Sequence, residues 1–166
     1  MKVSKIVTII LFVIPINLYC VLAQGEDAEI QPIVQIASDV YRVGEVIVDK
    51  KERKISVEGE INLTSGLIEY LLATRGYKDR ETVLVTEAKP IHLQIALILL
   101  GLEYGQNIEY EGEGEVPKGD PVDIWVEWSE GEKVRKVKGE ELVYDLVAEG
   151  VMEHTNWVFL GSQIIN

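Results

Sequence analysis

A run of apolar residues at positions 91–100 constrains the fold more than any other part of the sequence; its only polar members lie in the first turn. Pro90, just before the run, suits the start of a helix, because the N–H that proline lacks has no helical partner there. Gly101 is a typical helix stop. A helix that is apolar on all sides is covered by protein or spans a membrane, and ten residues reach only about 15 Å, half of a hydrocarbon core. We therefore expect a buried helix at the centre of a folded domain.

The first 23 residues have the pattern of a secretory signal peptide. Two lysines precede an apolar run at residues 6–16, and small residues stand three and one positions before a cut after Ala23. The run is too short to cross a bilayer. A lipoprotein cut at Cys20 is disfavoured, because the bulky Tyr19 precedes it where that processing requires a small residue. We predict a periplasmic or secreted protein with no integral membrane segment after signal cleavage.

Acidic residues outnumber basic ones, with 28 Asp and Glu against 16 Lys and Arg and a formal net charge of −12. Loss of the signal peptide removes two lysines and no acid, which lowers the charge to −14. Affinity for nucleic acid depends on neutralising phosphates, so we expect no nucleic-acid partner. Anionic membrane surfaces are disfavoured for the same reason. The only cysteine leaves with the signal peptide, which excludes disulfides, thiolate nucleophiles and cysteine-ligated metals from the mature domain.

The mature chain alternates between short strand patterns and turns. Residues 24–40 lack a clear period and are predicted to be an N-terminal linker, and residues 41–166 are predicted to form one domain. In the segment GEELVYDLVAEG, residues 139–150, apolar side chains fall on one helical stripe that predicts a second helix. The predicted fold class is α+β, a mostly antiparallel sheet with two helices packed on it. The sequence further predicts hairpins over residues 43–63, 66–87 and 122–138 and a terminal strand over residues 157–165.

Three segments carry a family resemblance: IEYLL at residues 68–72, HLQIALILLG at 92–101 and WVFLGS at 157–162. In this order, and with the strand VDIWVEW between the last two, they resemble the YdjY domain family of bacterial envelope proteins over roughly residues 43–162. The resemblance implies an envelope compartment and no established reaction.

The chain departs from the family at three places. Relatives usually carry Lys-x-His-Glu at the turn near residue 80, where this chain has Arg80 in place of the histidine. Some relatives carry ferredoxin-type cysteine motifs, and the mature chain has none. Relatives also continue past the Gly-Ser motif, so we expect a C-terminus shortened relative to the family, since the chain ends at Asn166.

Four residues are candidates for ligand binding: Glu69, Glu81, His92 and Trp125. A carboxylate near a histidine can act as an acid/base pair, but a strand of about five residues, roughly 16 Å, separates Glu81 from His92. In an antiparallel hairpin, Glu69 would lie beside the helix start, so a cluster of Glu69, Glu87 and His92 is the closer arrangement. Trp125 shares the polar face of its strand with two acids, where an exposed indole would indicate a binding surface.

The sequence favours a non-catalytic binding or interaction module of the bacterial envelope, with an envelope protein or an unknown ligand as its partner. One alternative is an enzyme that uses Glu69 and His92, together with Glu81, as an acid/base cluster. The other is an accessory component of an envelope redox system, which rests on the resemblance alone. No residue is assigned a catalytic role. No metal site or cofactor is predicted, because no pair of histidines has ligand spacing.

Overall fold

The computed structural model describes residues 33–106 and 116–161. Outside this part of the chain lie the predicted signal peptide, residues 24–32 of the predicted linker and the last four residues of the predicted terminal strand, 162–165.

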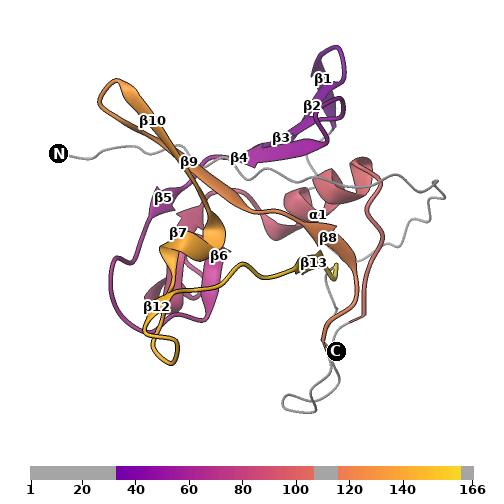
Figure 1. Cartoon of the computed structure of the whole chain (residues 1–166). Helices are drawn as coiled ribbons and strands as arrows, with labels where there is room; N and C mark the ends of the chain where they lie inside the picture. The colour runs from indigo at the N-terminus through magenta and orange to yellow at the C-terminus, as the bar shows by residue number, and fades with distance from the viewer. Residues whose placement is uncertain (1–32, 107–115, 162–166) are drawn as a thin grey trace.

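The N-terminal sheet is an antiparallel meander with the strand order β1-β2-β3-β4 (Figure 1). Side chains of β3 and β4 alternate between buried and half-buried, which confirms the hairpin predicted around residues 50–53. Residues 34–40 were expected within the linker, but they contain β1 and the start of β2. β1 gave no strand signal in the sequence, because an edge strand with four exposed side chains shows no inside–outside period. The strands are β1 (Val34–Ala37), β2 (Val40–Val43), β3 (Val46–Asp49) and β4 (Lys54–Val57).

The second sheet is mixed and has β7 at its centre. Its strands are β5 (Glu60–Ile61), β6 (Tyr70–Thr74) and β7 (Thr82–Thr86), in the order β5-β7-β6. All five side chains of β7 are buried, so β7, rather than the apolar helix, is the most deeply buried element.

β6 runs parallel to β7, so the antiparallel hairpin predicted for residues 66–87 is wrong. The connection is a compact loop that ends in the 3₁₀ turn η1 (Asp79–Glu81). The Asp79 carboxylate accepts the Gly76 N–H, and the Thr82 hydroxyl donates to the Lys78 carbonyl at 2.7 Å. Lys78 has a φ of 56°, in the left-handed region. Because these bonds close the loop on itself, the chain returns to the first end of β6 before β7 begins.

The helix predicted from residue 90 is confirmed as α1 (Pro90–Leu99), and Gly101 follows it with a φ of 89°. α1 packs against β2 and β3. His92 and Ala96, four residues apart, are its buried side chains.

The predicted fold class, α+β with two helices packed on a sheet, is wrong. The described residues are 43% strand and 14% helical, and α1 is their one α-helix, so the fold is mostly β with several small sheets. The predicted second helix is replaced by a 3₁₀ turn, η2 (Gly139–Leu142), and a small hairpin of β11 (Tyr144–Asp145) with β12 (Gly150–Val151). The Asp145 carboxylate accepts the N–H groups of Val147 and Ala148 at 2.7 and 3.0 Å, a local turn that competes with helix formation.

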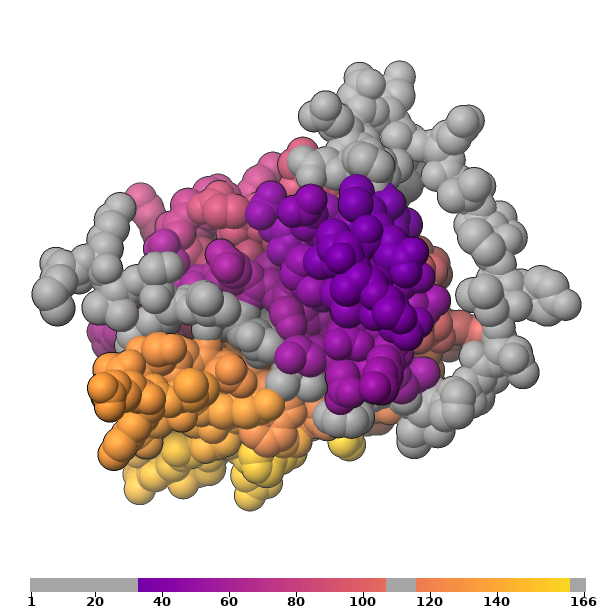
Figure 2. Space-filling view, turned by 90° about the horizontal axis from the view of Figure 1, so that it is seen from above, coloured from indigo at the N-terminus to yellow at the C-terminus, as the bar shows by residue number. Residues whose placement is uncertain are grey.

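The hairpin predicted for residues 122–138 is confirmed as β9 (Trp125–Glu130) paired with β10 (Lys133–Lys138). The strand predicted from residue 122 is interrupted at residues 123–124, so the residues before the interruption belong to a separate strand, β8 (Asp120–Val122). β8 pairs with the terminal strand β13 (Trp157–Phe159). In the space-filling view of Figure 2, the N-terminal sheet and the C-terminal hairpins occupy different parts of one face.

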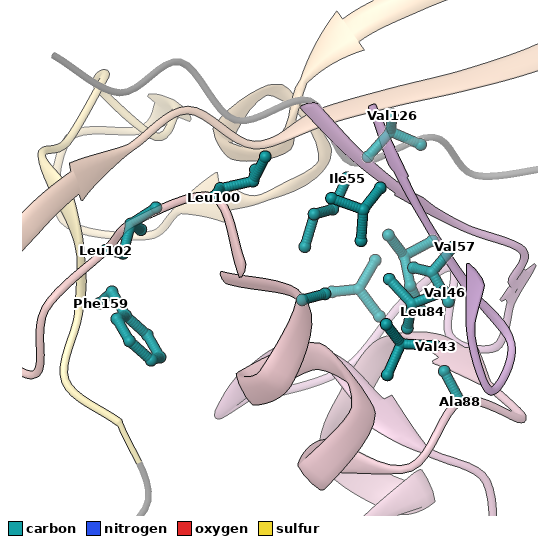
Figure 3. Close-up of a cluster of buried hydrophobic side chains, with 13 residues drawn as sticks. Val43, Val46, Ile55, Val57, Leu84, Ala88, Leu100, Leu102, Val126 and Phe159 are labelled. Atoms are coloured by element: carbon teal, nitrogen blue, oxygen red, sulfur yellow. The ribbon is translucent and has the colours of Figure 1, made fainter. Parts of the chain in front are cut away.

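The hydrophobic core lies where the two larger sheets and α1 meet. Figure 3 shows Val43, Val46 and Val57 of the first sheet gathered with Leu84 of β7, and Val126 of β9 closes the cluster. Burying a side chain such as Leu84 stabilises a fold by about 1.5–3 kcal/mol. The remaining buried members are Val48, Ile55, Val83, Ala88, Ala96, Leu100, Leu102 and Phe159.

Gly44 sets how closely α1 approaches the first sheet. It opens the two-residue turn between β2 and β3 with a φ of 57°, as a type II′ hairpin turn requires. A Cβ at Gly44 would lie 2.0 Å from the His92 ring, so only glycine leaves room for the helix.

We predict that Gly44→Ala lowers the free energy of unfolding by about 2–4 kcal/mol, from left-handed strain of about 1 kcal/mol plus overpacking of about 1–3 kcal/mol. Gly131→Ala is the matched control, because Gly131 opens the two-residue turn between β9 and β10 with a φ of 64° and nothing lies within 4 Å of its Cβ position. The control should lose only the strain component. Urea unfolding measures both, and equal losses would contradict the packing role of Gly44.

Candidate functional site

The structure brings two of the predicted site residues together. The Glu69 N–H donates to the Glu81 carbonyl at 2.9 Å, because parallel pairing places the first ends of β6 and β7 side by side. The Glu81 carboxylate pairs with the Lys78 ammonium at 2.7 Å. That hydrogen bond raises the pKa of Lys78, and Glu69 adds a smaller effect of the same sign. Glu69, Lys78 and Glu81 therefore form a charged group at one end of the sheet.

His92 lies at the opposite end of β7. The register pairs Tyr70 with Thr82 and Thr74 with Thr86, so about 16 Å of strand separates Glu69 from the segment that leads into α1. Glu87 does not join His92 either, because its carboxylate accepts a hydrogen bond from Arg75 Nε at 2.6 Å at an exposed site. The cluster of Glu69, Glu87 and His92 expected from an antiparallel hairpin is not formed.

His92 is buried, with 2% of its surface exposed, and its ring packs on the Gly44 turn. Neither ring nitrogen has a hydrogen-bond partner among the described residues. Burial lowers the pKa of His92, the nearby charge of Lys89 lowers it further, and Glu45 opposes both. The imidazole is thus held neutral inside the fold, where it fills space between α1 and the first sheet.

Trp125 is half-buried beneath two lysines of the partner strand. The ammonium groups of Lys136 and Lys138 lie 5.3 and 5.4 Å from the centroid of one of its rings. Lys138 also pairs with Asp123 at 2.8 Å, and this hydrogen bond raises the pKa of Lys138. The Trp125 ring is therefore covered by lysine ammonium groups, one of them paired with a carboxylate, and does not form an open aromatic surface.

Two of the hollows among the described residues hold apolar side chains in an arrangement that the sequence did not indicate. The larger, about 490 Å³, lies between the loop at residues 63–68 and the segment at residues 142–146. Exposed apolar side chains border it and continue along the β11–β12 hairpin; Leu67 is 82% exposed and Leu146 is 71% exposed. We call this surface the apolar patch; its members are Leu67, Tyr144, Leu146, Val147 and Val151.

The smaller hollow, about 300 Å³, lies along β6. Glu69 and Tyr70 stand at its exposed side, and Leu84 of β7 forms part of its wall. Trp157 of β13 also lines it, and the indole Nε1 of Trp157 is buried without a hydrogen-bond partner among the described residues. The remaining lining residues are Leu71, Leu72 and Ile124.

A model of the YdjY domain matches residues 46–166. The chain belongs to the YdjY domain family. The matched part of the YdjY domain begins with β3, so β1 and β2 precede it. Neither the search of curated proteins nor the search of solved structures gave a match.

The described residues of this YdjY domain were considered for a metal-binding group and for a membrane-spanning helix, and they contain neither. No three His, Cys, Asp or Glu side chains there are grouped so that they could hold a metal ion. No helix in the same ranges has the length and apolar character needed to cross a membrane.

Trp157 and Glu140 were not among the site residues predicted from the sequence. Glu140 of η2 is 1% exposed, and its Oε1 accepts the Thr155 N–H at 3.1 Å, 15 residues along the chain. Its other oxygen has no partner among the described residues. The Glu140–Thr155 hydrogen bond and the place of Trp157 in the smaller hollow cannot be predicted from periodicity, because each depends on segments that only tertiary folding brings together. Leu67 did leave a signal, since it is an apolar residue placed directly after the turn residues Ser65 and Gly66.

His92 should make this YdjY domain less stable as the pH falls from 7.5 to 5.5. The pKa of His92 is lower in the folded state than its unfolded value of about 6.5. The unfolded chain therefore binds more protons, and stability falls below pH 6.5 by up to about 1.4 kcal/mol per pH unit. We expect His92→Met to remove this slope in urea unfolding.

Val134→Met is the control, because the Val134 side chain is 65% exposed and carries no titratable group. It should keep the wild-type slope. A slope that survives in His92→Met would show that another group causes it.

Proposed function

We propose that this YdjY domain is a non-catalytic binding domain of the bacterial envelope and that it holds a protein partner at the apolar patch. One observation carries the proposal: the exposed side chains of Leu67, Tyr144 and Leu146 line one hollow, and Val147 at the tip of the adjoining hairpin is 95% exposed. Contiguous exposed apolar surface of this kind marks interaction sites in soluble proteins. The predicted signal peptide is the basis for the proposed location in the envelope.

Both sides of the apolar patch are held in place, which supports a binding role because a preorganised surface loses little entropy on association. On one side, the Asn62 side chain donates to the carbonyls of Asp79 and Thr82 and anchors the start of the 63–68 loop. On the other side, the Met152 N–H donates to the Val143 carbonyl at 2.9 Å and closes the β11–β12 hairpin. The partner would therefore meet a formed surface.

The acid/base enzyme is the weaker proposal on the described geometry. Its two principal residues, Glu69 and His92, lie at opposite ends of β7. A general base must be within hydrogen-bond reach of the group that it deprotonates, or within reach through one water. His92 is also closed off between α1 and the Gly44 turn.

A pull-down tests the proposed function. The tagged chain from residue 24 onward is incubated with envelope extract of the source bacterium, and bound proteins are quantified by mass spectrometry. We expect a specific partner whose recovery falls at least about tenfold with the double variant Leu67→Ser and Leu146→Ser. Both side chains are exposed and line the larger hollow, so their removal should change stability by only about 0.5 kcal/mol.

Val134→Ser is the matched control. Val134 of β10 is 65% exposed, close to the exposure of Leu146, but does not line the hollow. The control should recover the partner as the wild type does. Equal recovery by all three proteins would sink the proposal that the apolar patch binds the partner.

A further inference from the structure

The chain around the apolar patch carries acidic side chains and no basic ones. Each of the five patch residues has an acidic residue within two positions along the chain, and none has a lysine or arginine within that distance. Two positions span at most about 7.6 Å between Cα atoms, which is within the Debye length of about 8 Å at physiological salt. These charges therefore act on whatever covers the patch. We call them the acidic rim; its members are Glu69, Asp145, Glu149 and Glu153.

The charges of the acidic rim are available to a partner. Three members are exposed: Glu69, Glu149 and Glu153. Asp145 is half-buried, but the N–H groups of Ala148 and Val147 donate to its carboxylate, and these hydrogen bonds lower the pKa of Asp145. Within the part of the chain that the structure describes, no member of the rim forms an ion pair with a lysine or arginine.

Neighbouring elements do not supply the missing positive charge. The ends of the 63–68 loop contact η1, and residues 78–81 there hold two bases and two acids, with Lys78 already paired to Glu81. Residues 123–138, which include the β9–β10 hairpin, hold four bases and four acids. The tip of this hairpin lies at the upper left of Figure 1, away from β12 at the lower left. Residues 139–153, by contrast, hold five acids and no lysine or arginine.

The sign of the acidic rim distinguishes between possible occupants of the apolar patch. A bacterial membrane surface is anionic, so the rim repels it. A second copy of the chain, docked through the same patch by a twofold axis, would bring two acidic rims together, and like charges across an interface are unfavourable. A protein surface with lysines and arginines around its apolar side chains is attracted.

We propose that the partner held at the apolar patch is a basic protein whose contact surface surrounds apolar side chains with lysines and arginines. This inference rests on the proposed function, because it specifies the partner of the same patch. The apolar side chains of the partner bury Leu67, Tyr144 and Leu146, and its lysines and arginines meet the acidic rim. Charge pairs at the edge of an interface steer association and select the partner.

Synthetic peptides of equal length, in which leucine alternates with lysine, serine or glutamate, are the probes. Binding to the chain from residue 24 onward is measured by fluorescence anisotropy. At about 0.1 M salt we expect the leucine–lysine peptide to bind at least about tenfold more tightly than the leucine–serine peptide, and the leucine–glutamate peptide to bind most weakly. At about 1 M salt the Debye length falls to about 3 Å, so the preference for lysine over serine should disappear.

A rim variant locates the charge effect. It combines Glu69→Gln, Glu149→Gln and Glu153→Gln, and it leaves Asp145 in place because the Asp145 carboxylate closes the hairpin turn. Losing three exposed charge pairs should weaken binding of the leucine–lysine peptide about tenfold.

The matched control combines Glu52→Gln, Glu103→Gln and Glu132→Gln. These three acids are also exposed, and none lies within two positions of a patch residue. The control loses the same net charge and should bind the leucine–lysine peptide as the wild type does. The double variant Leu67→Ser and Leu146→Ser should bind this peptide at least about tenfold more weakly, because it removes the apolar contact.

Equal affinity of the rim variant and the control for the leucine–lysine peptide would overturn the proposal, as would full affinity in the double leucine variant. Co-sedimentation of the chain with phosphatidylglycerol vesicles would also overturn it, and so would a dimer in analytical ultracentrifugation that the double leucine variant dissociates. In the pull-down, a partner that the double leucine variant loses but the rim variant retains in full would uphold the proposed function and contradict this inference.

Discussion

The complete burial of β7 is the constraint on which the rest of the structure depends. Both neighbouring strands of its sheet pair with it, and none of its five side chains faces solvent. Its two threonines are buried without penalty, because the Thr82 hydroxyl donates to the Lys78 carbonyl and the Thr86 hydroxyl to the Glu58 carbonyl. The second bond ties Glu58, the residue after β4, to the second sheet. β7 thus holds together the loop before it, the first sheet and the entry into α1.

The direction of β6 beside β7 decides which candidate residues meet. Parallel pairing places Glu69 with Glu81 and leaves His92 at the far end, where the helix begins. An antiparallel hairpin would have exchanged these neighbours. The closed loop around Gly76 and Asp79 makes the difference, because its internal hydrogen bonds carry the chain back along β6 before β7 starts. Chemistry that needs a histidine beside a carboxylate is accordingly not assembled from these residues.

The larger and the smaller hollow differ in size and in lining. The apolar patch is broad, exposed and carried by a loop and a hairpin that are both anchored by hydrogen bonds, as a protein interface requires. The hollow along β6 is smaller and lined mainly by apolar side chains, with one unpaired indole donor. The binding role that we propose for this YdjY domain therefore needs no catalytic cluster.

Local patterns in the sequence determined the elements whose signals are local. Three predicted elements formed: the helix from Pro90, the hairpin that turns at residues 50–53, and the hairpin predicted over residues 122–138, whose paired strands are β9 and β10. Their signals are proline, glycine and inside–outside alternation, which act within a few residues. The YdjY family was also identified from the sequence, because the resemblance depends on the order of short segments. The apolar stripe at residues 142–147 predicted a helix, but the Asp145 turn formed a hairpin there instead.

Only the tertiary structure decided the direction of β6, the burial of His92 against Gly44 and the union of β6, Ile124 and Trp157 around one hollow. These contacts join residues far apart in the chain. They depend on which surfaces pack against each other in the complete domain. The hydrophobic period of a few neighbouring residues does not determine that packing.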